Sequence, residues 1–322
     1  MVDILAIGDA IVDIQTRVDE SFIKEHGIHK GTMTLVEKEV QQQIIAALDE
    51  QKIEKFSGGS AANTIISITQ LGGTARFFGK VGNDPYGAFY REDMKKAGVI
   101  FDTPSGEGMT GRCLVLVTPD GERTMLTHLG ICGQLSPDDI ALEHIKEAKM
   151  VYIEGYLWDS PPARETCMVI LKEAKKLGKK VAFTVSDPFV VCRYKDEFLK
   201  VIPLWFDLLF CNLDEGRELT GRIDQEEVIR CIGELVPQVA MTLGDEGALV
   251  FDRGTLHAVP TEKLTPIDTN GAGDAFAGGF LYRYLRDHSI ESCAHMGNCY
   301  SGLVVSQMGA RNRKPIPDVL RD

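Results

Sequence analysis

The sequence lacks several patterns that would each point to a particular class of protein. It has no run approaching the roughly 20 apolar residues of a membrane-spanning helix. Its eight cysteines never form a Cys-x-x-Cys pair, and its seven histidines show no metal-ligand spacing. These absences argue against a membrane protein, a disulfide framework and a zinc module. We therefore expect reduced cysteines in a cytoplasmic protein.

An excess of basic residues is also missing. The 322 residues include 35 lysines and arginines against 47 aspartates and glutamates, which gives a formal net charge of −12. A surface of that sign repels nucleic-acid phosphates, so we expect neither a nucleic acid nor a membrane as partner. Small anionic ligands are not excluded, because backbone amides and a metal ion can override the net charge locally.

Short apolar runs alternate with helical patterns along most of the chain. Strands are expected near 4–8, 74–80, 150–154, 180–185, 207–211 and 238–242, and helices near 60–71, 84–97, 161–177, 224–236, 273–286 and 291–307. In the strand expected at 150–154, residues 150–153 are apolar on both faces, as in a sheet covered by helices on both sides. We therefore predict an α/β fold with a doubly wound, mainly parallel sheet flanked by helices.

Other segments depart from this alternation. Residues 10–19 and 31–36 alternate with period two, and residues 111–129 predict a hairpin that turns at Pro119-Asp120-Gly121. Together with residues 53–57, these segments are expected to form a small β-sheet lid over the edge of the main sheet. We expect one domain over 1–322 that includes this lid.

The strongest motif lies at residues 267–276, where polar residues and glycines lead into a helix of small residues. Gly271 and Gly273 leave backbone N–H groups uncovered at a helix N-terminus, which is a favourable place for a phosphate. Asp274 follows in the first helical turn, where it could take a proton from an attacking hydroxyl. The alternative is an ordinary capped helix start, because aspartate is favoured there.

A second motif, at residues 56–64, places two glycines before another predicted helix. The amides of Gly58 and Gly59 could donate to sugar hydroxyls, and Asn63 offers both a donor and an acceptor. Asp13 lies just past the first strand, at the sheet edge where open α/β folds bind ligands, and its carboxylate suits a ribose diol. The alternatives are a loop-to-helix junction and a surface carboxylate.

Two further motifs follow strands. Asn212-x-x-Glu215 could orient a hydrated Mg²⁺ and phosphates, although the same residues could form a helix cap. Residues 242–247 combine a strand end with a glycine turn and weakly indicate a nucleotide site. By contrast, the G-x-G-x-x-G match at 106–111 does not follow a strand or precede a helix, so it does not predict a dinucleotide site.

With these motifs in this order, the chain resembles the ribokinase-like carbohydrate and nucleoside kinases along essentially its whole length. Both family signatures are present, at residues 58–63 and 268–274, with Asn212-x-x-Glu215 between them. The resemblance implies in-line transfer of the γ-phosphoryl group of ATP. It implies that Asp274 is the base and that the amides of Gly271, Ala272 and Gly273 stabilise the developing charge. It further implies that Glu215 and Asn212 act through Mg²⁺ and its waters. The residues implied to bind the ribose are Asp13, Gly59 and Asn63, and those implied to line the ATP site are Thr242, Gly244, Gly247 and Asn298. Stimulation by K⁺ is common in this family.

Within the family, residues 267–281 are very similar to the adenosine kinase branch, and Arg123 matches an arginine that reaches the transferring phosphate there. Asp9 departs from the asparagine usual in that branch and would lie close to the base. An apolar slot for the base is expected from Ile11, Leu35, Cys113 and Leu157. The resemblance thus implies 5′-phosphorylation of a purine nucleoside, adenosine first.

Three other interpretations stay open. Residues 111–113 and 121–124 also resemble inosine-guanosine kinases. A sugar kinase acting on ribose, fructose or a related sugar would share the same motifs, and so would a catalytically silent nucleoside-binding regulator. The sequence is compatible with a monomer or a homodimer.

Overall fold

The computed structural model describes residues 1–320, and its larger sheet has nine strands in the order β14-β13-β12-β11-β10-β9-β1-β5-β6. All neighbouring strands pair in parallel except β12 with β13 and β13 with β14. The strands are β1 (Val2–Ile7), β5 (Ala75–Phe78), β6 (Val99–Ile100), β9 (Ala148–Glu154), β10 (Lys180–Thr184), β11 (Leu208–Asn212), β12 (Gln238–Thr242), β13 (Ala248–Asp252) and β14 (Thr255–Val259).

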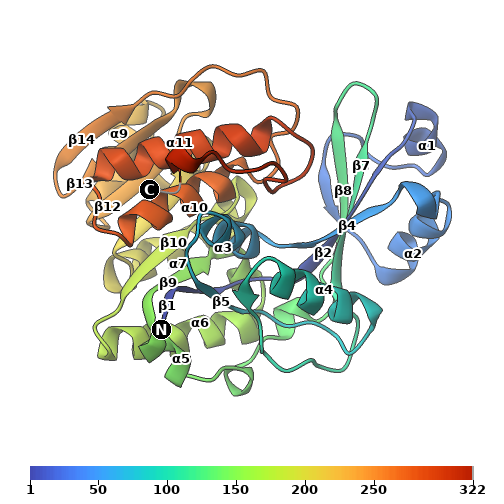
Figure 1. Cartoon of the computed structure of the whole chain (residues 1–322), viewed down its shortest axis with the longest axis horizontal. Helices are drawn as coiled ribbons and strands as arrows, with labels where there is room; N and C mark the ends of the chain where they lie inside the picture. The colour runs from blue at the N-terminus through green and yellow to red at the C-terminus, as the bar shows by residue number, and fades with distance from the viewer. Residues whose placement is uncertain (321–322) are drawn as a thin grey trace.

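Helices cover both faces of this sheet (Figure 1). One face is covered by α3 (Ser60–Gln70), α10 (Ala272–Tyr284) and α11 (Ile290–Val305). The other face is covered by α5 (Glu143–Glu147), α6 (Pro161–Lys176), α7 (Pro188–Trp205), α8 (Leu213–Thr220) and α9 (Gln225–Gly233). Short 3₁₀ helices lie at Glu50–Lys52, Cys132–Gln134, Pro137–Asp139, Gly155–Asp159, Gly244–Glu246 and Asp318–Leu320.

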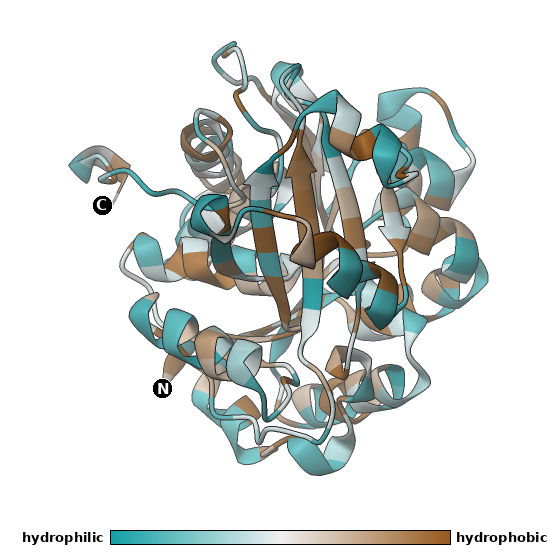
Figure 2. Cartoon of the chain, turned by 90° about the vertical axis from the view of Figure 1, so that its right-hand side faces the viewer, coloured by the Kyte–Doolittle hydropathy of each residue, from teal (hydrophilic) through white to brown (hydrophobic). Residues whose placement is uncertain are grey.

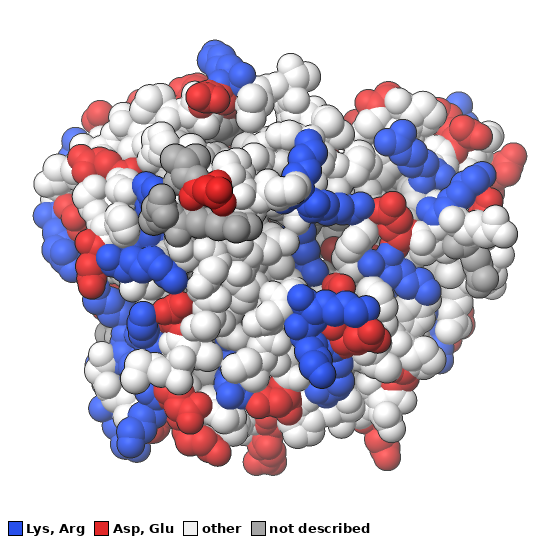
Figure 3. Space-filling model, in the orientation of Figure 1, with Lys and Arg blue, Asp and Glu red and all other residues white. Residues whose placement is uncertain are grey.

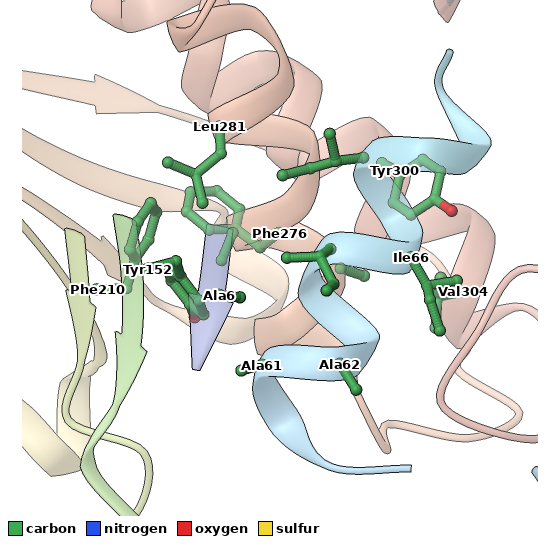
Figure 4. Close-up of a cluster of buried hydrophobic side chains, with 14 of the residues drawn as sticks. Ala6, Ala61, Ala62, Ile66, Tyr152, Phe210, Phe276, Leu281, Tyr300 and Val304 are labelled. Atoms are coloured by element: carbon green, nitrogen blue, oxygen red, sulfur yellow. The ribbon is translucent and has the colours of Figure 1, made fainter. Parts of the chain in front are cut away.

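Alternation along the strands explains the two hydrophobic layers. In β1, Ile4 and Ala6 enter the core beneath α3, α10 and α11, whereas Leu5 and Ile7 enter the core on the opposite face. Figure 4 shows the first layer, where side chains of α3, α10 and α11 meet strand residues such as Tyr152. Because successive strand residues point to opposite faces, a strand that is apolar throughout must be covered twice.

The smaller sheet has five strands in the order β3-β8-β7-β2-β4. These strands are β2 (Ile11–Arg17), β3 (Met33–Leu35), β4 (Glu54–Gly58), β7 (Gly111–Val117) and β8 (Arg123–His128). The helices α1 (Glu20–Glu25) and α2 (Lys38–Ala46) lie beside this sheet, and α4 (Pro85–Lys96) lies between it and the larger sheet (Figure 1). Figure 2 looks onto this end of the molecule, where hydropathy changes along the strands.

The two faces of the smaller sheet have different neighbours. Val12 and Leu114 point outward into a cluster that includes Ile23 of α1 and Ile44 of α2. Cys113 and Val115 point inward, toward Met308 of the segment that follows α11. The outer face is therefore covered by the chain's own helices, and the inner face is available to form one wall of a site.

The predicted fold class is confirmed, with a large, mostly parallel sheet between helices and a smaller second sheet. The antiparallel edge formed by β13 and β14 was not predicted. The expected domain range ends at residue 322, so its last two residues lie outside the described part. Within residues 1–320, no helix combines the length and hydropathy needed to cross a bilayer.

Candidate active site

The candidate site forms where the parallel strands end. Asp9 follows β1, Glu154 ends β9, Asn212 ends β11 and Thr242 ends β12, so their side chains gather at one edge of the sheet. This edge is where open α/β sheets bind ligands. The N-termini of α3 and α10 lie near the same edge. Figure 3 shows a hollow between the larger body and the smaller sheet, with lysine and arginine side chains along its margin.

Asp274 lies in the first turn of α10 and is held by two residues of α3. The Ser60 hydroxyl donates to Asp274 Oδ1 at 2.6 Å, and Asn63 Nδ2 donates to Oδ2 at 3.2 Å. Burial raises the pKa of Asp274 to about 6, although both hydrogen bonds act in the opposite direction. A carboxylate with such a pKa is ionised at neutral pH and still basic enough to accept a proton from a hydroxyl.

The backbone before Asp274 has the geometry of an anion site. Gly271 is the N-cap of α10 and adopts a left-handed conformation with φ of 71°. Among the described residues, no acceptor takes a hydrogen bond from the backbone N–H of Gly271, Gly273 or Asp274, whereas Ala272 N donates to the Thr269 carbonyl. These amides lie at the positive end of the helix dipole and can bind a phosphate oxygen.

Asp268 fixes this loop to the C-terminal segment and to the smaller sheet. Its buried carboxylate accepts hydrogen bonds from Asn270 N at 2.8 Å and Gly309 N at 2.6 Å. It also forms an ion pair with Arg123, the first residue of β8. In this arrangement the Arg123 guanidinium contacts the loop that carries the free amides, so it lies near the expected position of a phosphate.

Asn212 and Glu215 form a reciprocal cap at the start of α8. Asn212 Oδ1 accepts from Glu215 N at 2.8 Å, while Glu215 accepts from Asn212 N at 2.9 Å and from Asn212 Nδ2 at 2.7 Å. The helix-cap alternative is therefore present in the structure. Glu215 also lines a cavity with Asp274 and Thr242, so the cap does not exclude a role in the site.

The Glu215 carboxylate is a candidate magnesium ligand, directly or through water. Burial raises its pKa to about 7, and the nearby carboxylates of Asp187 and Asp274 act in the same direction. A bound cation would stabilise the charged form of this side chain. Hard oxygen donors are the ligands that Mg²⁺ prefers, so the residues present fit a hydrated Mg²⁺.

The residues expected to contact ATP line one continuous cleft. Thr242, Gly244, Gly247 and Asn298 line it together with Ala272 and Gly273 of the anion site. The cleft shares Thr242, Gly273 and Phe276 with the cavity that contains Asp274 and Glu215. Asn298 Nδ2 donates to the Val259 carbonyl at 2.9 Å and thereby holds one wall of the cleft.

A separate pocket lies on the other side of Asp274, beneath the inner face of the smaller sheet. It is lined by Asp13, Gln15, Phe56, Asn63, Val115, Asn270, Ala310, Arg311 and Arg313. Burial raises the pKa of Asp13 to about 6. Gly59, at φ 102°, is so close to the Asp9 carbonyl that a side chain at this position would collide with it. Gly58 likewise has no room for a side chain beside the Asp13 carboxylate.

The expected apolar slot is only partly present. Ile11 and Cys113 share the inner face of the smaller sheet. Leu35 lies on an edge strand and is 52% exposed. Leu157 was wrongly included, because it is fully buried in the core on the opposite face of the large sheet.

Several site residues escaped sequence reasoning. Ser60 directly follows the N-cap Gly59, and its hydroxyl binds Asp274. Glu154 is fully buried and accepts from Asp9 N at 2.7 Å and Ala61 N at 2.6 Å, which joins the end of β1 to the start of α3. A glutamate directly after the apolar run at 150–153 was the available signal. No local sequence pattern pointed to Arg311 as a site residue.

Asp9 itself is buried beside Glu154. Burial raises the pKa of the Asp9 carboxyl to about 6, and a hydrogen bond with Cys132 lowers it. A protonated Asp9 can donate a hydrogen bond, and an ionised one can accept two or more. The residue could therefore distinguish between ligands that present donors and ligands that present acceptors.

Comparison with known proteins agrees with this geometry. The family model described as pfkB family carbohydrate kinase matches residues 3–317. The crystal structure of an adenosine kinase from Sinorhizobium meliloti is 37% identical, with a TM-score of 0.90, over 98% of this chain and 97% of that one. A probable sugar kinase from Rhizobium etli CFN 42 is 35% identical, with a TM-score of 0.90, over 98% and 96%. Adenosine kinase 2 of Arabidopsis thaliana is 28% identical over 98% of this chain and 96% of its own length.

Fold and site together define an enzyme that transfers a phosphoryl group from ATP to a hydroxyl group. The doubly wound sheet, the helix N-terminus with free amides and the adjacent buried aspartate are the parts that this reaction requires. The chain belongs to the pfkB family of carbohydrate kinases.

The buried carboxylates predict opposite effects of pH on activity and stability. The pKa values of Asp13 and Asp274 are raised to about 6 and that of Glu215 to about 7. Raised pKa values mean that the folded state holds protons which the unfolded chain has already released. The resulting stability is fully present below the unfolded pKa values, near 4, and is lost as pH rises through 6 to 7.

We therefore expect kcat/KM to fall below about pH 6, because Asp274 must be ionised to accept a proton. Over the same range, the melting temperature of the ligand-free protein should rise as pH is lowered from 7.5 to 5.5. Initial rates and thermal unfolding in one set of buffers measure both trends. A melting temperature that rises with pH together with activity would contradict the burial of these groups.

Proposed function

We propose that this protein is a purine nucleoside kinase that transfers the γ-phosphoryl group of ATP to the 5′-hydroxyl of adenosine. The observation that supports this most is the position of Asp274. It is hydrogen-bonded to Asn63, which lines the pocket under the smaller sheet, and it also lines the cavity that joins the ATP cleft. A hydroxyl held in the first pocket would meet a phosphate held in the second beside this carboxylate.

In the proposed reaction, Asp274 Oδ accepts the proton of the attacking hydroxyl. Ser60 and Asn63 hold the carboxylate in place so that the bound hydroxyl meets it in the correct geometry. The free amides of Gly271 and Gly273 then stabilise the charge on the transferring phosphoryl group. Arg123 adds positive charge on the same side. Phosphoryl transfer depends mainly on such positioning and electrostatics.

The substrate pocket holds the sugar. The Asp13 carboxylate accepts from two neighbouring hydroxyls, while Gly58 leaves room for that carboxylate and Gly59 leaves room for the Asp9 carbonyl. The smaller sheet acts as the lid of a single domain, and Ile11 and Cys113 on its inner face cover the base. Because α1 and α2 already cover its outer face, this lid does not need a second subunit to bury it.

ATP occupies the cleft lined by Thr242, Gly244, Gly247 and Asn298. Glu215 and Asn212 would hold Mg²⁺ through its waters. When bound, the ion would neutralise part of the negative charge of the ATP phosphates. We further propose stimulation by K⁺ near the 268–274 loop. The enzyme is proposed to work in the cytoplasm.

Two alternatives within the same chemistry have specific support. The Asp9 carboxylate is buried beside Glu154, and the resemblance to adenosine kinases implies that it lies close to the base; there it would accept from an N–H donor, which favours inosine or guanosine. A sugar kinase is the second alternative, because the Rhizobium etli relative described as a probable sugar kinase matches the fold equally well.

A substrate panel separates these alternatives. ADP release is measured with adenosine, inosine, guanosine, ribose and fructose at equal concentrations with saturating Mg²⁺–ATP, in the presence and absence of K⁺. We expect kcat/KM for adenosine to exceed that for either free sugar by at least about 100-fold, since the base adds buried contact area. A preference for ribose or fructose would overturn the proposal, and a preference for inosine or guanosine would favour that alternative over adenosine.

A further inference from the structure

Arg311 lies in the segment after α11 and is connected to the candidate base through one intervening residue. Its Nε donates to Asn63 Oδ1 at 3.0 Å, and Asn63 Nδ2 donates to Asp274 Oδ2 at 3.2 Å. Its Nη1 donates to Ser57 Oγ at 3.1 Å and lies 3.2 Å from Asp93 Oδ2. The Arg311 side chain is only 13% exposed, and its contacts with Asn63, Ser57 and Asp93 fix its orientation.

This arrangement permits only one orientation of the Asn63 amide. A flipped amide would direct its NH₂ group toward Arg311, which has no acceptor, and its oxygen toward the Asp274 carboxylate, which has no donor when ionised. Arg311 thereby makes Asn63 a hydrogen-bond donor to Asp274. Removing the guanidinium would release the amide to rotate.

The remaining guanidinium nitrogen has no such partner. Arg311 Nη2 is one of seven buried arginine nitrogens without a hydrogen-bond partner among residues 1–320, and of these arginines only Arg311 lines the pocket under the smaller sheet. The residue lines the pocket that Asp13 and Asn63 also line. Buried donors are almost always paired, because burying one unsatisfied costs about 1–3 kcal/mol. A ligand oxygen in this pocket would supply the missing acceptor.

The charges around the pocket indicate which kind of oxygen this is. Three arginines border the site, and each has its own carboxylate: Arg311 with Asp93, Arg313 with Glu54 and Arg123 with Asp268. The carboxylates of Asp13 and Asp274 have no such arginine partner, so the site carries excess negative charge. An anionic substrate group would face this excess negative charge, whereas a neutral hydroxyl can accept from Arg311 and donate to Asp13.

We propose that Arg311 is a substrate-binding residue whose Nη2 donates to a ring hydroxyl of the sugar, while its Nε orients Asn63. This assignment rests on the proposed function to the extent that the acceptor carries a neutral sugar. It explains why a buried arginine sits beside a pocket for an uncharged substrate. It also predicts rejection of sugar acids, whose carboxylate would add a third negative charge.

Deoxygenated substrates test the contact directly. The acceptor is the one that the wild-type enzyme phosphorylates in the substrate panel, together with analogues that lack one ring hydroxyl each, such as 2′-deoxyadenosine and 3′-deoxyadenosine. Arg311→Met should lower kcat/KM for the intact acceptor about 10- to 100-fold, the usual effect of losing a hydrogen bond to a charged group. For the analogue lacking the contacted hydroxyl, the same substitution should lower kcat/KM clearly less, because only the loss that follows from the released Asn63 amide remains.

Two comparisons keep the result interpretable. Arg311→Lys retains the charge beside Asp93 but cannot donate from several guanidinium nitrogens at once. It should therefore reduce the ratio of kcat/KM for the intact acceptor to kcat/KM for the analogue, even if Arg311→Met fails to fold. Arg286→Met removes another partly buried arginine, paired with Asp3 at the far end of β1, and should leave discrimination unchanged. Equal losses on the intact acceptor and every analogue, or no loss at all, would overturn the assignment. A free sugar as the best acceptor would overturn the nucleoside proposal and leave this test in place.

Discussion

Asp274→Asn is expected to lower kcat by a factor of about 10²–10⁴, because asparagine keeps the shape of the side chain but cannot accept the hydroxyl proton. The affinity for the nucleoside should change much less, since the pocket residues Asp13 and Arg311 are untouched. Steady-state kinetics measure kcat, and equilibrium binding of the nucleoside measures affinity. Retained turnover in this variant would remove Asp274 from the role of base.

The same substitution is expected to raise the melting temperature of the ligand-free protein at pH 7.5. Burial disfavours the ionised form of Asp274, as its raised pKa indicates, so a neutral side chain removes an unfavourable charge. Asp196→Asn changes the charge equally on an exposed part of α7 and serves as the matched control. A lower melting temperature for Asp274→Asn than for this control would show that the carboxylate supports the fold.

Gly271→Ala is expected to lower kcat by about 10²–10³ with a smaller change in nucleoside affinity. The glycine has φ of 71°, and a side chain there would collide with the backbone of Ala310. The loop would have to move, which displaces the free amides from the phosphate. Losing one such donor typically costs that much in rate. The kcat values of the variant and the wild type provide the test.

Gly178→Ala is the control for backbone strain without loss of the site. Gly178 has a similar φ of 64°, but a side chain there meets nothing within 4 Å. Its cost should be confined to stability, on the order of 1 kcal/mol. Equal rates for Gly271→Ala and the wild type would contradict the anion-site assignment.

Much of this enzyme was predictable because its motifs are local. The glycine amides and Asp274 lie within four residues of one another, so a helix start beside a glycine loop already implies their geometry. Short apolar runs likewise predicted the central parallel strands, whose middle residues are apolar. The antiparallel strand β14 was missed because Val259 is its one buried residue, which weakens the apolar signal, and β13 was missed because its apolar run is short and directly follows a glycine turn. The short helix α8 gave too few turns for a helical period.

The network around the base was not predictable because it is assembled by the fold. Ser60 and Asp274 are 214 positions apart, and Arg311 and Asn63 are 248 apart. No local pattern distinguishes Arg311 from any other arginine near a chain's end. Its role depends on the segment after α11 passing beneath the smaller sheet, which only the packed structure defines.

The site also explains how a protein with a net charge of −12 can bind ATP. Its Glu215 carboxylate is buried with a raised pKa, so a cation beside it is favoured. The phosphates, by contrast, would meet the free amides of the 271–274 segment and the Arg123 guanidinium, as proposed above. Local geometry therefore separates a place for the metal from a place for the anion.

The identity of the product tests the central proposal most directly. After incubation with Mg²⁺–ATP and adenosine, ³¹P NMR should show one new phosphomonoester coupled to the two 5′ protons, together with ADP. The matched acceptor 5′-deoxyadenosine should give no phosphomonoester. Three results would contradict the assignment of the 5′-hydroxyl as the group that Asp274 deprotonates. They are phosphorylation of the 2′- or 3′-hydroxyl, turnover of 5′-deoxyadenosine, and a product formed only with free sugars.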